Sequence, residues 1–105
     1  MITKLPMFEK IYEVVSRIPK GKVTTYKKVA AVTGIQNPRL VGVVLHRNID
    51  PQHVPCHRVV RNNGTIATGY AFGGTKKQRE KLKSEGVHFL PNDRVDLTKC
   101  LYQVI

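Results

Sequence analysis

The chain has 105 residues, of which 41% are hydrophobic and 24% are charged, a balance typical of one small globular domain and not of a disordered segment. No apolar run approaches the ~20 residues that a membrane span needs, and the first residues lack the apolar core of a signal peptide. Eighteen Lys and Arg against seven Asp and Glu give a formal net charge of +11, which favours a polyanionic partner, nucleic acid before an anionic membrane surface.

Two helices are predicted in the first third of the chain. Residues 7–18 carry apolar side chains at helical spacing with charged residues opposite, which indicates an amphipathic helix. Thr24 or Thr25 is a suitable N-cap for a second, short helix that begins at Tyr26. Gly34 is a typical residue for ending it.

A third helix is expected to begin at Asn37-Pro38, a cap residue followed by proline at the first helical position, and to continue to Arg47. Two short helices joined by a turn have the form of a helix-turn-helix, which many helical hairpins share. The charge of the chain makes DNA binding the better interpretation. Gly42 in the helix interior costs about 1 kcal/mol relative to alanine, so it is expected to permit close approach of another helix or of a nucleic-acid backbone.

The second half mixes turns with one more helix. Residues 59–66 are predicted to form a tight hairpin around Asn63-Gly64. Glycines around Tyr70 and Phe72 indicate a loop that forms a pocket wall. Thr75 and Gln78 have the spacing of a capping box for a helix that ends near Gly86. Short segments from Val87 to Leu97 complete the expected domain.

Cys56 lies between Pro55 and His57-Arg58, with apolar residues on both sides. Three interpretations compete for it: a small buried hydrophobic residue, a metal ligand with His53 and His57, or a nucleophile held partly as thiolate by its neighbours. A closed zinc site needs four ligands, and Cys100 stands alone, so we expect no metal. Two distant cysteines form no disulfide framework, which favours an intracellular location, cytoplasmic or nuclear.

The motif Pro55-Cys56-His57-Arg58-Val59 resembles the active-site signature of the O6-alkylguanine-DNA alkyltransferases (methylated-DNA–protein-cysteine methyltransferases). The similarity extends from about residue 7 to 97. It includes Ile18-Pro19-x-Gly21-x-Val23-x-Thr25-Tyr26, Arg39 followed by Val41-Gly42, Asn48, Gly69-Tyr70, Gly73-Gly74 and Glu85-Gly86. The resemblance is to the catalytic and DNA-binding domain, so residues 1–105 are expected to be that single domain, without an N-terminal domain. The expected fold is mainly α with a small β-hairpin, a winged helix-turn-helix-like DNA-binding domain.

The resemblance implies a role for each site residue. Cys56 would accept the alkyl group, His57 would take the thiol proton through a water, and Glu85 would orient His57. Asn48 would brace the turn that carries the thiol, and Tyr26 would protonate the departing guanine. No cofactor is implied, because the alkyl group passes directly to the thiol.

The family flips the damaged base out of the duplex and reads DNA from the minor groove. By resemblance, Arg39 would fill the vacated space, while Thr24, Thr25, Leu40 and Gly42 would face the DNA. The base would be held by Tyr26, Val59, Tyr70 and Ala71. The expected partner is double-stranded DNA containing O6-alkylguanine. The protein is expected to act as a monomer and not to associate with a membrane.

Three functions remain open on the sequence. The first is a repair protein that transfers one alkyl group from DNA to Cys56. The second is an alkyltransferase-like protein that binds the lesion without transfer; such proteins typically have tryptophan or alanine at the cysteine position, so Cys56 favours the first. The third is a helix-turn-helix regulator with a redox-sensing thiol.

Overall fold

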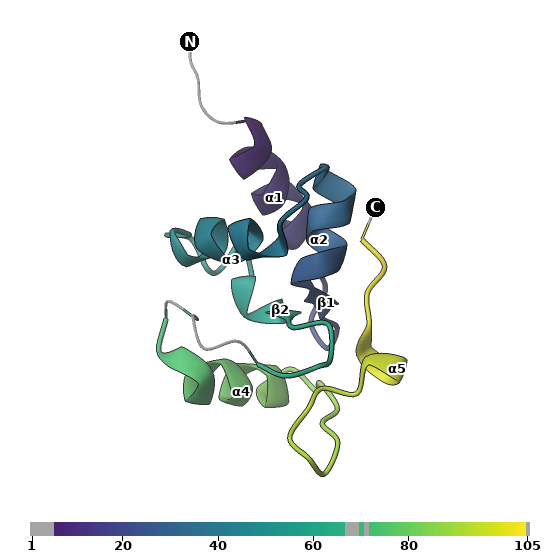
Figure 1. The fold of residues 1–105 in the computed structure, drawn as a ribbon. Helices are drawn as coiled ribbons and strands as arrows, with labels where there is room; N and C mark the ends of the chain where they lie inside the picture. The colour runs from purple at the N-terminus through teal and green to yellow at the C-terminus, as the bar shows by residue number, and fades with distance from the viewer. Residues whose placement is uncertain (1–5, 67–69, 71, 105) are drawn as a thin grey trace.

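Three helices form the N-terminal half of the structure, a computed structural model that describes residues 6–66, 70 and 72–104 (Figure 1). They are α1 (Pro6–Ser16), α2 (Tyr26–Thr33) and α3 (Pro38–His46). The predicted caps are present, because the Thr25 hydroxyl accepts a hydrogen bond from the Lys28 N–H at 3.1 Å and the Asn37 side chain accepts one from the Arg39 N–H at 3.0 Å. Gly34 ends α2 in the left-handed region, at φ 79°. The helix-turn-helix prediction is therefore confirmed.

The small sheet joins two segments that are far apart in the sequence. β1 (Thr24–Thr25) and β2 (Val59–Val60) pair in parallel, with Thr24 opposite Val59 and Thr25 opposite Val60. The predicted hairpin at 59–66 is wrong as a strand pair, although a turn is present in which the Arg61 N–H donates to the Thr65 carbonyl at 3.0 Å. Both strands are fully buried, as is usual for parallel pairs, and α2 and α3 supply the crossover that such a pair requires.

The C-terminal half contains a short 3₁₀ helix η1 (Cys56–Arg58), α4 (Gly74–Ser84) and α5 (Leu97–Cys100). The predicted capping box is wrong: Gly73 is the N-cap of α4, without a side-chain bond. The Gln78 amide is buried and donates instead to the carbonyls of His57 and Val59, at 2.9 and 3.2 Å. The domain also extends beyond Leu97, because the Tyr102 N–H donates to the Val23 carbonyl at 2.7 Å.

Two hydrophobic clusters meet at the strand pair. The first fills the space between α1, α2 and α3 and includes Ile11, Val29, Val41 and Val59. The second lies under α4 and the C-terminal segment and includes Val60 and Leu82. Figure 1 accordingly shows the strands between the three N-terminal helices and α4. The mainly helical fold class is confirmed, with a parallel pair in place of the hairpin.

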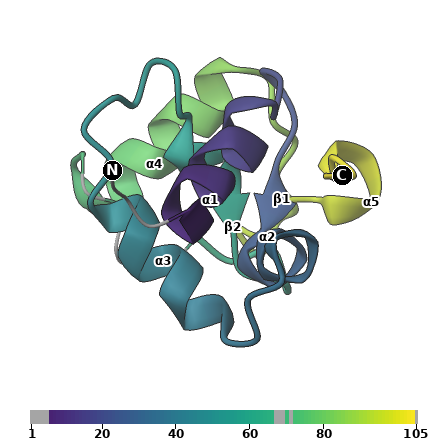
Figure 2. The same ribbon diagram turned by 90° about the horizontal axis from the view of Figure 1, so that it is seen from above.

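Seen from above, α3 and α5 lie on opposite sides of the molecule, with the strands between them (Figure 2). The face formed by α3 is therefore separate from the C-terminal segment. Within the described residues, every helix falls short of the length and apolar character that crossing a bilayer requires.

Candidate thiol site and nucleic-acid interface

Cys56 is the first residue of η1, and its side chain is buried, with 6% of the residue exposed. The Asn48 amide nitrogen lies 3.5 Å from Sγ and also donates to the Val54 carbonyl at 2.8 Å. The Asn48 amide oxygen accepts from the Asp50 N–H at 3.0 Å. One buried side chain thus fixes both ends of the loop between α3 and η1 and points its donor at the sulfur.

Burial raises the pKa of the Cys56 thiol, against the opposing effects of the Asn48 hydrogen bond and the Lys81 charge. The thiol is therefore protonated at neutral pH in the free protein. Because the thiolate is the nucleophilic form, a reaction at Cys56 requires a nearby base.

His57 follows Cys56 and is also buried, with 3% of the residue exposed. Its Nε2 lies 3.0 Å from the Glu85 Oε2, at the C-terminal end of α4. A carboxylate only accepts hydrogen bonds, so Nε2 carries the hydrogen and Nδ1 keeps its lone pair. Nδ1 is buried and has no hydrogen-bond partner among the described residues. Burial lowers the pKa of His57, more than Glu85 raises it, so the imidazole is neutral and able to accept a proton at Nδ1.

Glu85 also receives a two-point contact from Arg58. The guanidinium Nε and Nη2 donate to Oε1 and Oε2 at 2.9 and 2.7 Å, and Nη1 donates to the Ile18 carbonyl at 2.6 Å. Burial alone would raise the pKa of Glu85, but the hydrogen bonds from Arg58 and His57 lower it below its ordinary value. His57 is thus oriented by a carboxylate that stays ionised, and Arg58 links that carboxylate to the segment after α1.

Tyr26, the first residue of α2, connects the thiol site with the surface. It lines a small cavity of about 10 Å³ together with Cys56, Tyr70 and Gln78. Burial, and then the charge of Cys56, raise the pKa of Tyr26 to about 12. The phenol therefore keeps its proton at neutral pH and can donate it.

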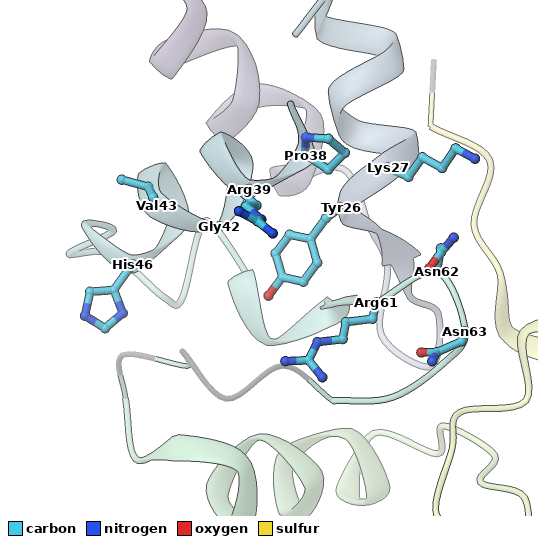
Figure 3. A pocket seen from close by; sticks show the side chains of 10 residues that line it. All are labelled: Tyr26, Lys27, Pro38, Arg39, Gly42, Val43, His46, Arg61, Asn62 and Asn63. Atoms are coloured by element: carbon cyan, nitrogen blue, oxygen red, sulfur yellow. The ribbon is translucent and has the colours of Figure 1, made fainter. Parts of the chain in front are cut away.

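A groove of about 600 Å³ opens on the other side of Tyr26, between α3 and the turn that follows β2 (Figure 3). This volume lies within the range of small-molecule pockets. Its basic residues come from three elements, with Lys27 on α2, Arg39 on α3 and Arg61 after β2. No Asp or Glu is among the ten described residues that line it. Tyr26, Gly42 and His46 line both the groove and the cavity, so the groove leads to the thiol.

The exposed face of α3 is shaped by a glycine. A Cβ placed on Gly42 would meet only the Tyr26 ring, at 3.8 Å. Gly42 therefore leaves space in the groove and does not serve close packing of another helix. Leu40, which we expected to face DNA, packs against the first hydrophobic cluster, while Val43, half-exposed at 50%, lines the groove.

Other predicted contact residues have different positions. Thr24 and Thr25 are buried, with 0% and 3% exposed, and Thr25 caps α2. Their side chains therefore belong to the packed interior and do not lie on the surface. Val59 is also buried, and its carbonyl accepts from Gln78. Ala71 lies outside the described residues.

Two residues of this site were missed in the sequence. Lys81 donates to the Tyr70 hydroxyl at 3.2 Å, and Arg61 lines the groove opposite Arg39. Both sit in basic stretches without a local motif, so only their positions in space distinguish them from other surface cations.

The structure gives no support to a metal site at Cys56, because the histidines expected as further ligands have other partners. The His53 Nδ1 pairs with the Asp50 carboxylate at 2.9 Å, and His57 with Glu85. Among residues 6–66, 70 and 72–104, no three His, Cys, Asp or Glu side chains gather as metal ligands.

The sequence profile described as "6-O-methylguanine DNA methyltransferase, DNA binding domain" matches residues 6–87. The chain belongs to this family. The methylated-DNA–protein-cysteine methyltransferase of Methanothermobacter thermautotrophicus is 45% identical over 78 residues, which are 74% of this chain and 43% of that protein. The DNA base-flipping protein of Escherichia coli is 38% identical over 93 residues, 87% of this chain and 70% of that protein.

Among solved structures, Atl1 of Schizosaccharomyces pombe in complex with damaged DNA containing O6-carboxymethylguanine matches with a TM-score of 0.79 and 29% identity. The match covers 96% of this chain and 98% of that one. This alkyltransferase family thus includes both transferases and alkyltransferase-like proteins, and it acts in O6-alkylguanine repair with DNA base flipping. The chain spans less than half the length of the transferase relative.

Proposed function

We propose that this protein binds double-stranded DNA containing O6-alkylguanine, flips the modified base out and transfers its alkyl group once to Cys56. The observation that supports this most is the arrangement of a buried thiol, an Asn48 donor at 3.5 Å and a His57–Glu85 pair at 3.0 Å. A nucleophile next to a base, with the base oriented by a third group, is the general form of an activated nucleophile.

The proposed reaction is a single displacement. The thiol proton passes to the His57 Nδ1 through one water, and the resulting thiolate attacks the alkyl carbon on O6. The S–C bond forms as the C–O6 bond breaks, and the electron pair leaves with guanine. Tyr26, whose pKa of about 12 keeps it protonated, gives the departing base a proton, and the proton held by the His57 imidazolium then returns to the phenolate through solvent. The product is a stable thioether, so each molecule reacts once.

The proposed DNA surface is the groove between α3 and the turn after β2. Arg39 on α3 would occupy the space left by the flipped base, and Lys27 and Arg61 would contact phosphates. The absence of acidic residues among the described lining of the groove and the net charge of +11 support this assignment. We propose that residues 1–105 act as one such unit, as a monomer, within the cell where DNA is present.

The second candidate is lesion binding without transfer. The observation that favours it is the structural match to Atl1, which has a TM-score of 0.79 and covers 96% of this chain. In that case the same groove would hold the flipped base, and Cys56 would stay unmodified.

The intact mass of the protein after incubation with a duplex carrying one O6-methylguanine distinguishes alkyl transfer from lesion binding without transfer. We expect a gain of one methyl group, located on the Cys56 peptide, and no gain for Cys56→Ala. Cys100→Ser is the matched control for the other buried cysteine and should be methylated like the unmodified chain. Tight binding of the lesion duplex with unchanged mass would replace the first candidate with the second.

A further inference from the structure

Lys81 projects from the exposed face of α4 toward the thiol site. Its Nζ donates to the Tyr70 hydroxyl at 3.2 Å and lies 5.9 Å from the centre of that ring. The Tyr70 ring in turn packs edge-on against the His57 imidazole, with centroids 6.4 Å apart and an interplanar angle of 65°. Tyr70 is buried, at 8% exposed, and lines the same small cavity as Cys56. One ammonium thus fixes an aromatic side chain that covers both the base and the nucleophile.

The side chains around the thiol come from four elements and the loop before η1. They include Tyr12 on α1, Tyr26 on α2, His46 on α3, Asn48 before η1 and Lys81 on α4. Tyr12 and Tyr26 have raised pKa values and stay neutral, and His57 is neutral as described above. Lys81 is the positive charge that lowers the pKa of the Cys56 thiol.

This charge has the same consequence for both titrating groups. It lowers the pKa of the Cys56 thiol and also that of His57, because a nearby cation favours the thiolate and disfavours the imidazolium. Because both pKa values fall, the pH range in which Cys56 is a thiolate and His57 is neutral begins at a lower pH. In that range Cys56 is already the nucleophilic thiolate and needs no proton transfer to His57.

We propose that Lys81 is a positioning residue of the thiol site, holding Tyr70 against His57 and supplying the positive charge that favours the nucleophilic form of Cys56. The proposal rests on the transfer function, because it assigns Lys81 a role in activating the alkyl acceptor. It adds to the thiol site a residue on α4, which lies one turn before Glu85, the C-cap of that helix.

The test measures thiol reactivity without DNA, so that it stands apart from the transfer assay. Alkylation of Cys56 by iodoacetamide is followed from about pH 6 to pH 10, by mass spectrometry of the peptide that contains Cys56. The proteins are the unmodified chain, Lys81→Met, Lys81→Arg and Lys83→Met. Lys83 is the matched control, because it is an exposed lysine of the same helix whose Nζ lies over Phe89 at 5.3 Å.

We expect Lys81→Met to move the pH profile to higher pH and to slow alkylation near neutrality by on the order of threefold or more, because a nearby positive charge that favours the thiolate is lost. Lys81→Arg should restore the profile, and Lys83→Met should leave it unchanged. Equal profiles for Lys81→Met and Lys83→Met would overturn the proposal, as would failure of Lys81→Arg to restore the rate. Thermal unfolding of each variant checks that the fold is intact.

The two proposals can fail separately. If the unmodified chain gains no methyl group from DNA but the Lys81→Met profile shifts, the transfer function fails and the role of Lys81 in tuning the thiol stands. If the methyl group is transferred and the profiles coincide, the role of Lys81 is overturned and the transfer function stands.

Discussion

Glu85 is the residue on which the shape of the thiol site most depends. It accepts hydrogen bonds from His57 and from the Nε and Nη2 of Arg58, and its side chain is 12% exposed. Removing its charge would leave a buried guanidinium with a neutral partner. Glutamine has one acceptor oxygen where Glu85 has two, so it cannot accept from the Arg58 Nε and also from the His57 Nε2 and Arg58 Nη2.

Glu85→Gln is therefore expected to lower the free energy of unfolding by about 2 kcal/mol, since hydrogen bonds to charged groups contribute more than neutral ones. It should also slow methyl transfer, because the His57 Nδ1 lone pair is no longer fixed. Urea denaturation at neutral pH measures the first effect, and single-turnover transfer measures the second.

Glu80→Gln is the matched control on the same helix. Glu80 pairs with Lys77 at 3.8 Å, and both side chains are more than half exposed, so its loss should change stability by less than about 0.5 kcal/mol. Equal stability changes in the two variants would show that the contacts of Glu85 do not hold the site together.

At the scale of elements, α3 combines two conflicting requirements. A helix is more stable with any ordinary residue than with glycine in its interior, yet Gly42 lies at the wall of the groove, where a Cβ would approach the Tyr26 ring. The presence of glycine at this position is explained if something enters the groove, because the interior of the protein does not need it.

Substitutions of Gly42 should consequently change stability and DNA affinity in opposite directions. We expect Gly42→Ala to raise the free energy of unfolding by about 0.5–1 kcal/mol. Gly42→Leu, which also favours a helix but fills the groove, should weaken binding to a duplex with O6-methylguanine by about tenfold or more, roughly 1.4 kcal/mol. Chemical denaturation and fluorescence anisotropy provide the two measurements.

Gly34→Ala provides the comparison, because it makes the same chemical change at a left-handed residue, φ 79°, with nothing within 4 Å of the added Cβ. It should destabilise the protein by about 1 kcal/mol and leave lesion affinity unchanged. If Gly42→Leu binds the lesion duplex as tightly as Gly34→Ala, the groove is not the DNA surface.

The elements also show which parts of the fold are readable in the sequence. Helices α2 and α3 were predicted because Thr25, Gly34 and Asn37 act on their own neighbours. The strand pairing was not predicted, since each residue of β2 pairs with one that lies 35 positions earlier, as Val60 does with Thr25. No local signal in the sequence reports that pairing. Gln78 illustrates the same limit: its spacing from Thr75 suggested a cap, but tertiary contacts with the carbonyls of His57 and Val59 determine its position.

The candidate site divides in the same way. Cys56 and His57 stand together in a recognisable motif, while the approach of Asn48 and Glu85 was expected through the family resemblance and not through spacing. Lys81 and Arg61 were missed, because a lysine in a basic helix and an arginine in a turn look like any other exposed cation until the chain is folded.

At the scale of the whole molecule, three of the basic residues gather at one groove. Lys27, Arg39 and Arg61 reach the same groove from three elements, whereas Glu13 on α1 pairs with Arg17 at 3.6 Å and Asp93 pairs with Arg79 at 2.7 Å on the α4 side. A cation that meets phosphate releases a condensed counterion, so its contribution appears in the salt dependence of binding.

Arg61→Ala should therefore lower DNA affinity and make the slope of log K against log salt concentration less negative by about 1. The loss should be similar for duplexes with and without O6-methylguanine, because a phosphate contact does not depend on the base. Lys10→Ala removes the same charge from the exposed side of α1, outside the groove, and should leave the slope within error. Fluorescence anisotropy between about 50 and 200 mM salt measures each slope. Equal slopes for Arg61→Ala and the unmodified chain would mean that the turn after β2 does not contact the DNA backbone, and the interface would then reduce to α2 and α3.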